Sequence, residues 1–444
     1  MIGRGVAFSG DPYTPGVGTW SYRVHSYDLT LDYRVETNRL DGVAVLQAEA
    51  VVELDRITLD LSKLKASKVW LDGRRLPRVS QSTHTLTVRP EAPIAAGTAF
   101  ELRIEYGGRP GPRRSTWGHI GWEELDDGVL TASQPSGSST WFPCNDRPGD
   151  KAAYRIRISA EQDYTVVCSG ELLEKSTRSG RTSWLYEQTA PTAAYLATVQ
   201  IGRYQRRTDA PGRTRSKPPV PVDYAYPAAL DSRARADFDG LAHMLRFFGA
   251  TFGPYPFSRY TVVVTDDELE IPLEAQALAI FGSNHVDGEG GSERLIAHEL
   301  AHQWFGNSVG LAAWKDIWLN EGFACYAEWL WSEENGGPSA ASLAAEHHAR
   351  LRAAPQDLVI GEPGAASMFD DRVYKRGALT LHALRLRLGD EPFFGLLRAW
   401  TAEHAHATAD TAAFVALAES RTSLPLHDFF GAWLHTESLP ALAP

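Results

Sequence analysis

The sequence predicts an α+β protein of two domains: an antiparallel β domain over residues 1–205, then a mainly helical domain over residues 206–444. A chain of 444 residues is too long for one ordinary hydrophobic core. Apolar and polar residues alternate through about the first two hundred positions, which is typical of strands with one buried face. After a stretch rich in Pro and Gly at 209–222, apolar residues recur three and four positions apart, as on one face of a helix.

The strands expected in the first domain follow the alternating runs. Turn residues such as Asp72-Gly73 separate these runs at intervals that suit hairpins. The predicted strands lie within residues 21–35, 56–73, 98–108, 152–159 and 195–204.

Helices dominate the expected second domain. A single strand, 259–265, stands among helices at 233–253, 375–389, 391–404 and 426–435. Two further helices form the centre of the domain. The first is expected to begin after an N-cap at Ser292 and to end at Gly306-Asn307, and the second to run over 320–335 from Asn320.

Composition excludes several classes of protein. The net charge of −11 and the lack of a basic run argue against a nucleic-acid surface. The three cysteines are widely spaced without a CxxC pair, which favours a reducing compartment over a disulfide framework or a thiolate zinc site. No apolar signal-peptide core and no run of eighteen apolar residues occurs, so we expect a cytoplasmic protein without membrane contact. The sequence does not fix the oligomeric state, and a monomer is the expectation.

The central helix predicts a metal site. His298 and His302 are i and i+4, so both rings leave one face about 6 Å apart along the axis and can share one tetrahedral zinc ion. Glu299 points about 100° away, where it misses the metal but reaches a water bound to it. This is the HExxH arrangement, in which the glutamate is the general base. Glu321, in the first turn of the next helix, is the expected third protein ligand.

The alternative is a pair of amphipathic helices that carry polar residues for no chemical purpose. From the histidine and acidic content, HExxH arises by chance in roughly 5% of such chains, and a later acidic residue at fixed spacing lowers this to under about 1%. Burying two histidines and a glutamate without partners also costs several kcal/mol. We therefore favour a catalytic site with one zinc ion per chain.

The same stretch resembles a known family. HELAHQWFGN (298–307) and WLNEGFACYAE (318–328) are similar to the zinc-binding signature of the aminopeptidase N family of gluzincin peptidases. The resemblance covers nearly the whole chain. It implies a β-saddle domain followed by a thermolysin-like catalytic domain, in a short member that lacks the helical C-terminal domain of many relatives.

The resemblance also implies residues that handle the substrate. An aminopeptidase needs a carboxylate for the free N-terminal ammonium, and IPLEAQ (271–276) supplies Glu274 where related peptidases have GxMEN, although Glu270 is an alternative. SQPSGSSTWFPCNDRPGDKAAY (133–154) places Gln134 where the family has Gln or Glu lining the amine pocket. VYKRGAL (373–379) resembles the YxKGA segment with Arg376 for lysine, so Tyr374 is the expected oxyanion donor.

The spacing on the second helix adds one further candidate. Glu328, two turns after Glu321, is a candidate to orient a ligand histidine.

Together these residues predict a zinc aminopeptidase acting on peptides with a free N-terminus. Two rivals stay open: a gluzincin endopeptidase without an amine clamp, and a non-enzymatic interaction protein that keeps the fold. The preferred N-terminal residue and the physiological peptides are not determined by the sequence.

Overall fold

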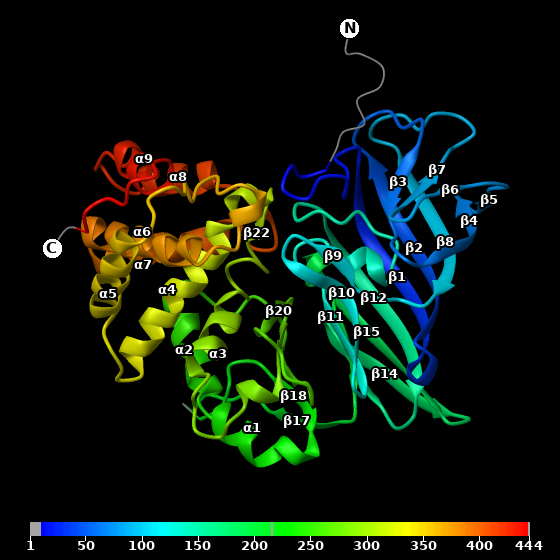
Figure 1. The fold of residues 1–444 in the computed structure, drawn as a ribbon, viewed down its shortest axis with the longest axis horizontal. Helices are drawn as coiled ribbons and strands as arrows, with labels where there is room; N and C mark the ends of the chain where they lie inside the picture. The colour runs from blue at the N-terminus through cyan, green and yellow to red at the C-terminus, as the bar shows by residue number, and fades with distance from the viewer. Residues whose placement is uncertain (1–9, 215, 443–444) are drawn as a thin grey trace, which may run out of the picture. The chain divides into compact units, whose positions relative to one another are not determined.

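The computed structural model describes residues 10–214 and 216–442 (Figure 1). The first nine residues, part of the N-terminal stretch without an apolar signal-peptide core, lie outside the described residues. The chain divides into two compact units. The first takes in the described residues up to Arg206 together with Ala225–Ala228 and Val263–Asp267, and the second takes in the remainder. A β-rich N-terminal part followed by a largely helical part confirms the predicted fold class.

The first unit is built on an eight-stranded sheet of order β14-β15-β12-β1-β2-β8-β4-β5 (Figure 1). Its strands alternate buried and exposed side chains, as the sequence pattern predicts. The strands are β1 (Tyr22–Arg34), β2 (Arg39–Ala50), β4 (Lys65–Leu71), β5 (Arg74–Arg75), β8 (Ala99–Gly108), β12 (Lys151–Glu161), β14 (Glu171–Arg178) and β15 (Arg181–Ala193).

Not every pair in this sheet is antiparallel. Strand β1 pairs with β12 in parallel, with Ser26 opposite Ala153 and Asp32 opposite Ser159. The long intervening chain forms other strands before it returns, so the two strands run in the same direction without a hairpin. The alternating pattern identifies such strands, but it carries no information about their relative direction.

Two smaller sheets complete the unit. One has the order β13-β16-β11-β10-β9, and the other is β3-β7-β6. The predicted strand 56–73 is therefore two strands, β3 and β4, which belong to different sheets. One hydrophobic core joins the sheets, since it includes Leu29 and Ile156 of the large sheet with Val129 and Ile201 of the five-stranded one. The strands are β3 (Ile57–Asp60), β6 (Ser80–Gln81), β7 (Thr85–Val88), β9 (Arg113–Ser115), β10 (Gly118–Leu125), β11 (Gly128–Ala132), β13 (Thr165–Cys168) and β16 (Val199–Gly202).

The part of the chain expected to be mainly helical, residues 206–444, is less exclusively helical than the sequence predicts. Its helices accompany a five-stranded sheet of order β17-β18-β19-β21-β20, of which only β19 was expected (Figure 1). Strands β20 and β21 have only three and four residues, too few for an alternation to be recognised, and β18 is buried along almost its whole length, so its side chains do not alternate. The sheet strands are β17 (Tyr204–Asp209), β18 (Val222–Pro227), β19 (Tyr260–Val264), β20 (Leu273–Ala275) and β21 (Leu278–Phe281).

The helices mostly follow the predicted ranges. The expected helix 233–253 is split around Gly240, the N-cap of α2, because glycine disfavours the helix interior. The described residues contain no helix with the length and apolar character needed to cross a bilayer. The helices are α1 (Asp231–Asp237), α2 (Leu241–Phe252), α3 (Glu293–Ala301), α4 (Trp318–Glu334), α5 (Ala340–Ala353), α6 (Asp371–Leu388), α7 (Asp390–Glu403), α8 (Thr411–Ser420) and α9 (His427–Leu434).

The ends of the two central helices differ from expectation. Helix α3 stops at Ala301, with His302 as its C-cap. The backbone N–H groups of Gln303 and Trp304 then donate to the carbonyl oxygens three residues earlier, as in a 3₁₀ turn. Ser292 is the N-cap of α3, as predicted, but its side chain makes no capping hydrogen bond. Helix α4 begins at Trp318, two residues earlier than predicted, and Asn320 lies inside it.

Candidate active site

Helices α3 and α4 bring together the three predicted metal ligands. Oε2 of Glu321 lies 3.5 Å from Nε2 of His298 and 3.4 Å from Nε2 of His302. The potential ligand atoms of all three side chains lie within 4.8 Å of one another. The two imidazole rings are 4.7 Å apart at an angle of 81°, so their ring edges converge without stacking. All three side chains are buried.

In both histidines the ring nitrogen Nδ1 already has a hydrogen-bond partner. Nδ1 of His298 lies 2.7 Å from Oε1 of Glu328, and Nδ1 of His302 lies 3.0 Å from the backbone oxygen of Phe305. Each contact places the ring proton on Nδ1 and leaves the lone pair of Nε2 facing Glu321. Burial acts to raise the pKa of the Glu328 carboxyl. The hydrogen bond from His298 and the positive charges of Lys375 and Arg294 outweigh this effect and lower the pKa to about 2.

The donor set fits a zinc ion. Tetrahedral zinc bonded to nitrogen and oxygen at about 2.0–2.2 Å separates its donors by about 3.3–3.5 Å, which agrees with the two distances to Glu321. Two imidazoles and one carboxylate also leave the open position of a catalytic site. Glu274, Glu299 and His302 form a second close group. We favour the first group, because both of its imidazole lone pairs face the same carboxylate oxygen.

Glu299 lies beside this cluster without a bonded partner for one oxygen. Its side chain is 4% exposed, and Oε2 makes no hydrogen bond to any described residue. Burial raises the pKa of Glu299, the histidines oppose that shift, and the charges of Glu274 and Glu321 add to it. A buried carboxylate with a free oxygen and a raised pKa is suited to take up a proton.

Glu274 reaches the cluster from the sheet. It lies on β20, and a buried side chain of the turn after α3 holds the β20–β21 hairpin to that helix. Gln303 accepts from the backbone N–H of Ala277 at 2.8 Å and donates to the oxygen of Ala275 at 3.2 Å. Asn307 also donates to Ala275 at 2.9 Å. Burial raises the pKa of Glu274, and the charge of the nearby His302 acts in the opposite direction.

Tyr374 approaches from α6. Its ring is stacked on that of His298, with 6.1 Å between centroids and 16° between planes. Helices α4 and α6 come close because two glycines face each other: a Cβ on Gly322 would lie 2.8 Å from Cα of Gly377. Burial and the neighbouring carboxylates raise the pKa of Tyr374 well above its usual value, so the phenol keeps its proton as a hydrogen-bond donor.

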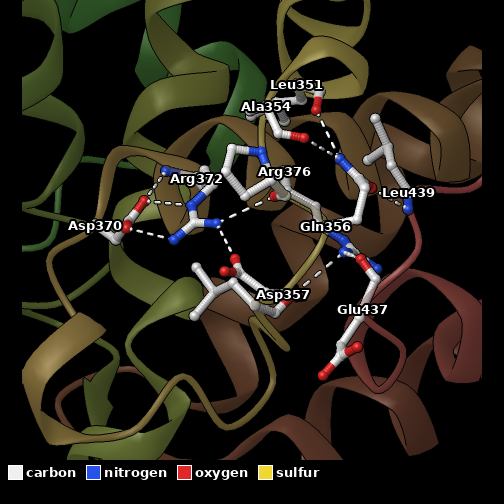
Figure 2. Close-up of polar contacts among 11 residues, drawn as sticks. Leu351, Ala354, Gln356, Asp357, Asp370, Arg372, Arg376, Glu437 and Leu439 are labelled. Atoms are coloured by element: carbon white, nitrogen blue, oxygen red, sulfur yellow. Dashed lines mark hydrogen bonds and ion pairs between the residues drawn. The ribbon is translucent and has the colours of Figure 1, made fainter.

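Arg376, where the family segment has lysine, anchors the same helix to the chain that follows α9. Its guanidinium donates to the backbone oxygens of Trp433, Glu437 and Thr436 at 2.7–2.9 Å, and to further carbonyls nearby. Figure 2 shows this contact with Glu437 beside the Arg372–Asp370 pair at the start of α6. The substitution for lysine therefore has a structural role, two residues from Tyr374.

Gln134 belongs to the other compact unit. It follows β11 in a half-buried position. Its predicted contact with the substrate amine stays a prediction.

The sequence reasoning missed several residues that support this site. Gln303 and Asn307 lie inside the HELAHQWFGN segment but carry no metal-binding signature, and their role depends on a hairpin that the sequence does not predict. No role was predicted for Lys375, because it occupies the variable position of the YxKGA-like segment. A polar residue inside an otherwise buried run, such as Gln303, is the signal that could have revealed them.

Comparisons with known proteins agree with this arrangement. Residues 236–433 match the Peptidase family M1 domain, and residues 24–196 match the Peptidase M1 N-terminal domain. Aminopeptidase M1 of Arabidopsis thaliana is 26% identical over 356 residues, 74% of this chain and 39% of the plant protein. The leucyl aminopeptidase of Saccharolobus solfataricus is 23% identical over 396 residues, 84% of this chain and 48% of the archaeal protein. The chain thus spans less than half the length of these two relatives.

A solved structure matches at full length. A mutant M1 zinc metallopeptidase from Deinococcus radiodurans, bound to a Tyr-Ser-Ala substrate, is 31% identical with a TM-score of 0.89, and the match covers 98% of each chain. The fold is that of a two-domain zinc metallopeptidase. More narrowly, this chain belongs to peptidase family M1.

Proposed function

We propose that this chain is a zinc aminopeptidase that removes the N-terminal residue from short peptides. The observation that carries the proposal is the convergence of His298, His302 and Glu321 on one point, with the free oxygen of Glu299 beside it. The names of the relatives support the exopeptidase activity, and the tripeptide bound to the Deinococcus enzyme supports short substrates.

His298, His302 and Glu321 are proposed to hold one zinc ion per chain. When bound, zinc supplies Lewis acidity and lowers the pKa of water toward ~7. Glu299 accepts the proton of the attacking water and delivers it to the leaving amine. Tyr374 donates a hydrogen bond to the oxyanion that develops on the scissile carbonyl.

Glu274 and Gln134 are proposed to bind the free N-terminal ammonium. A half-buried carboxylate makes a strong charge-assisted hydrogen bond with an ammonium group. An anchored amine leaves only the first peptide bond beside Glu299, which accounts for cleavage one residue from the end. Glu270, the alternative, is exposed.

The test compares free and N-acetylated peptides, with and without a chelator. We expect Tyr-Ser-Ala to be hydrolysed and its N-acetyl form to be spared, and chelation to abolish activity until zinc is restored. Glu274→Ala should lower kcat/KM by about a hundredfold, in line with the loss of a charged hydrogen bond. Glu270→Ala is the matched control and should change it by less than about twofold, as is usual for surface residues.

Each rival predicts a different result. Equal rates on blocked and free peptides indicate an endopeptidase. Absence of hydrolysis by a protein that contains zinc indicates an interaction protein that keeps the fold.

A further inference from the structure

The first compact unit carries a hollow of about 570 Å³ with a basic lining. Its wall is formed by the loop after β3, the residue before β7, the β9–β10 hairpin and two prolines. We call it the basic hollow; its basic residues are Lys63, His84, Arg113, Arg114 and His119. No acidic residue of the described chain lines it, although the whole chain has a net charge of −11.

The basic groups of this hollow have no carboxylate partners. Within the described residues, none of the five forms an ion pair. Other arginines of the same unit do: Arg103 pairs with Glu105 at 2.9 Å, and Arg157 pairs with Glu174 at 3.1 Å. Positive groups gathered in a concave wall without acids raise the local potential and attract anions.

Arg113 is the most firmly held of these cations. Its Nη2 donates to Oγ of Ser136 at 2.8 Å, while Nε is buried and has no hydrogen-bond partner among the described residues. Burial raises the pKa of Asp60 to about 6 and that of Asp146 to about 7, and the charge of Arg113 acts against both shifts. The guanidinium is therefore fixed in place by the core behind it, while part of its hydrogen-bonding capacity stays unused.

Lys63 reaches the hollow from a strained backbone. Its φ is 60°, in the left-handed region that residues other than glycine seldom adopt. A Cβ on Gly111 would lie 3.2 Å from Nζ of Lys63, so the ammonium lies directly over the chain that leads into β9. Strained residues of this kind gather at binding sites, where the surrounding structure holds them in place.

The remaining basic groups are also positioned by their neighbours. The backbone N–H of Leu61 donates to the oxygen of His84 at 3.0 Å, and Nδ1 of His84 lies 3.1 Å from Oγ of Ser62. Arg114 and His119 are opposite each other in the β9–β10 pairing, so their side chains leave the same face of the hairpin. Like charges in such a cross-strand pair repel, and an anion between them removes the repulsion.

The chemistry of the wall indicates the class of anion. Guanidinium groups bind phosphate oxygens through two parallel hydrogen bonds, and a lysine ammonium adds a point charge. A volume of about 570 Å³ is typical of small-ligand sites and is many times the roughly 30 Å³ of one water molecule, so the hollow has room for more than one phosphate group. No Phe, Tyr or Trp of the described residues lines it to stack a nucleobase, so recognition falls to charge.

We infer that the basic hollow binds a diphosphate group, as the inorganic ion or as an ester, through Lys63, Arg113 and Arg114 with the two histidines beside them. The site uses none of the residues proposed for peptide hydrolysis. Either proposal can therefore fail without the other.

The experiment measures binding of pyrophosphate, ADP and inorganic phosphate to the zinc-loaded full chain by calorimetry. The salt concentration is about 0.15 M, where attraction between exposed charges is screened beyond about 8 Å. We expect pyrophosphate and ADP to bind at least about tenfold more tightly than phosphate, the scale of one added hydrogen bond between charged groups. Whichever of the two binds more tightly identifies the inorganic ion or the ester as the preferred form. Phosphate binding as tight as that of pyrophosphate contradicts a diphosphate site.

A double substitution locates the site. Lys63→Gln with Arg114→Gln removes two exposed cations and leaves Arg113 in place, and it should weaken pyrophosphate binding by at least about tenfold. Lys65→Gln with Arg109→Gln is the matched control, because both residues are exposed, belong to the same unit and lie outside the lining. The control removes the same charge and should change the affinity by less than about twofold.

Three results overturn the inference. Equal losses in the two double variants would reveal only a diffuse attraction by charge. Citrate binding as tight as that of pyrophosphate would show that the hollow does not select phosphate. Binding that survives Lys63→Gln with Arg114→Gln but disappears after chelation would place the anion at the proposed zinc site. If that double variant does not fold, the two single variants are compared with the matched control in the same way.

Discussion

Glu328 accepts a hydrogen bond from Nδ1 of His298 at 2.7 Å. Glu328 lies on the same helix, α4, as Glu321. One face of α4 therefore supplies both a proposed metal ligand and the carboxylate that orients another ligand. Arg294 holds the second oxygen of Glu328 at 3.0 Å. This contact keeps the carboxylate charged in a buried position and fixes the direction of the imidazole ring.

Replacing Glu328 should weaken zinc binding without removing a ligand. Glu328→Gln lowers the basicity of His298 and allows its ring to turn, so we expect a 10–100-fold loss of zinc affinity, as is typical of such outer partners. The measurement is a competition titration against a chromogenic chelator.

The control is Glu334→Gln, farther along α4. Glu334 also pairs with a histidine, His243 at 2.9 Å, but neither belongs to the proposed site. Equal zinc affinities for Glu328→Gln and Glu334→Gln would show that the His298 contact does not tune the metal.

Tyr374→Phe should lower kcat and leave zinc content unchanged. The phenol is proposed to interact only with charge that develops in the transition state. Its loss should therefore cost about 2.7–4 kcal/mol of barrier stabilisation, or about a hundredfold to a thousandfold in kcat, with little change in KM. Steady-state kinetics on Tyr-Ser-Ala and metal analysis test this.

The matched control is Tyr326→Phe, which removes another buried hydroxyl of the same unit, one that contacts His382 at 3.3 Å. A similar loss of kcat in both variants would indicate a general effect of tyrosine removal. A raised KM for Tyr374→Phe would indicate a binding role instead.

The long elements of the fold could be predicted from the sequence. The strand over 21–35 and the helices near 375–389 and 391–404 have patterns that extend over many residues. The bounds of β1 and α7 agree with prediction to one residue, whereas α6 begins four residues earlier than predicted, at Asp371. Short strands such as β20 give too little alternation to recognise. The parallel pairing of β1 with β12 depends on contacts far apart in the chain, which a local pattern does not encode.

In the candidate site, too, local features could be predicted from the sequence and contacts between distant segments could not. The spacing of His298 and His302 on one helix predicts their convergence, because helix geometry alone fixes it. The approach of Tyr374 depends on the contact between Gly322 and Gly377, which lie on separate helices. The division near residue 205, the role of Gln134, the cytoplasmic location and the monomeric state stay predictions.

The stability of the chain should respond to pH through a buried acid of the first unit. Asp146 is buried and accepts from the backbone N–H of Ser138 at 3.0 Å. Burial, and then the charge of the nearby Asp60, raise its pKa to about 7, against the opposing charge of Arg113. The folded chain thus holds this proton to higher pH than the unfolded chain, whose carboxyl has a pKa of about 3.9. Its contribution to stability is complete below about pH 4 and is lost as the pH rises through about 7.

Asp146→Asn should remove this dependence. Asparagine keeps an oxygen to accept from Ser138 but does not ionise. The thermal midpoint of the variant should therefore rise relative to that of the wild type between pH 5 and pH 8, by about 2–4 °C for each kcal/mol. Asp28→Asn, on the exposed side of β1, controls for the loss of one negative charge. A constant difference between Asp146→Asn and the wild type over this pH range contradicts the prediction.

Arg376→Lys should destabilise the chain although it restores the residue of the family segment. The guanidinium donates to carbonyls at the end of α9 and in the residues after it, including those of Ala432, Thr436 and Glu437. An ammonium has three donors on a flexible stem and leaves some of these buried oxygens without a partner, at a cost of about 1–3 kcal/mol. We expect a lower thermal midpoint and faster proteolysis of residues 432–438. Arg387→Lys is the matched control: Arg387 is exposed and donates to a single carbonyl, that of Pro425, at 2.8 Å. If both variants melt at the same temperature, the contacts of Arg376 do not stabilise this part of the chain.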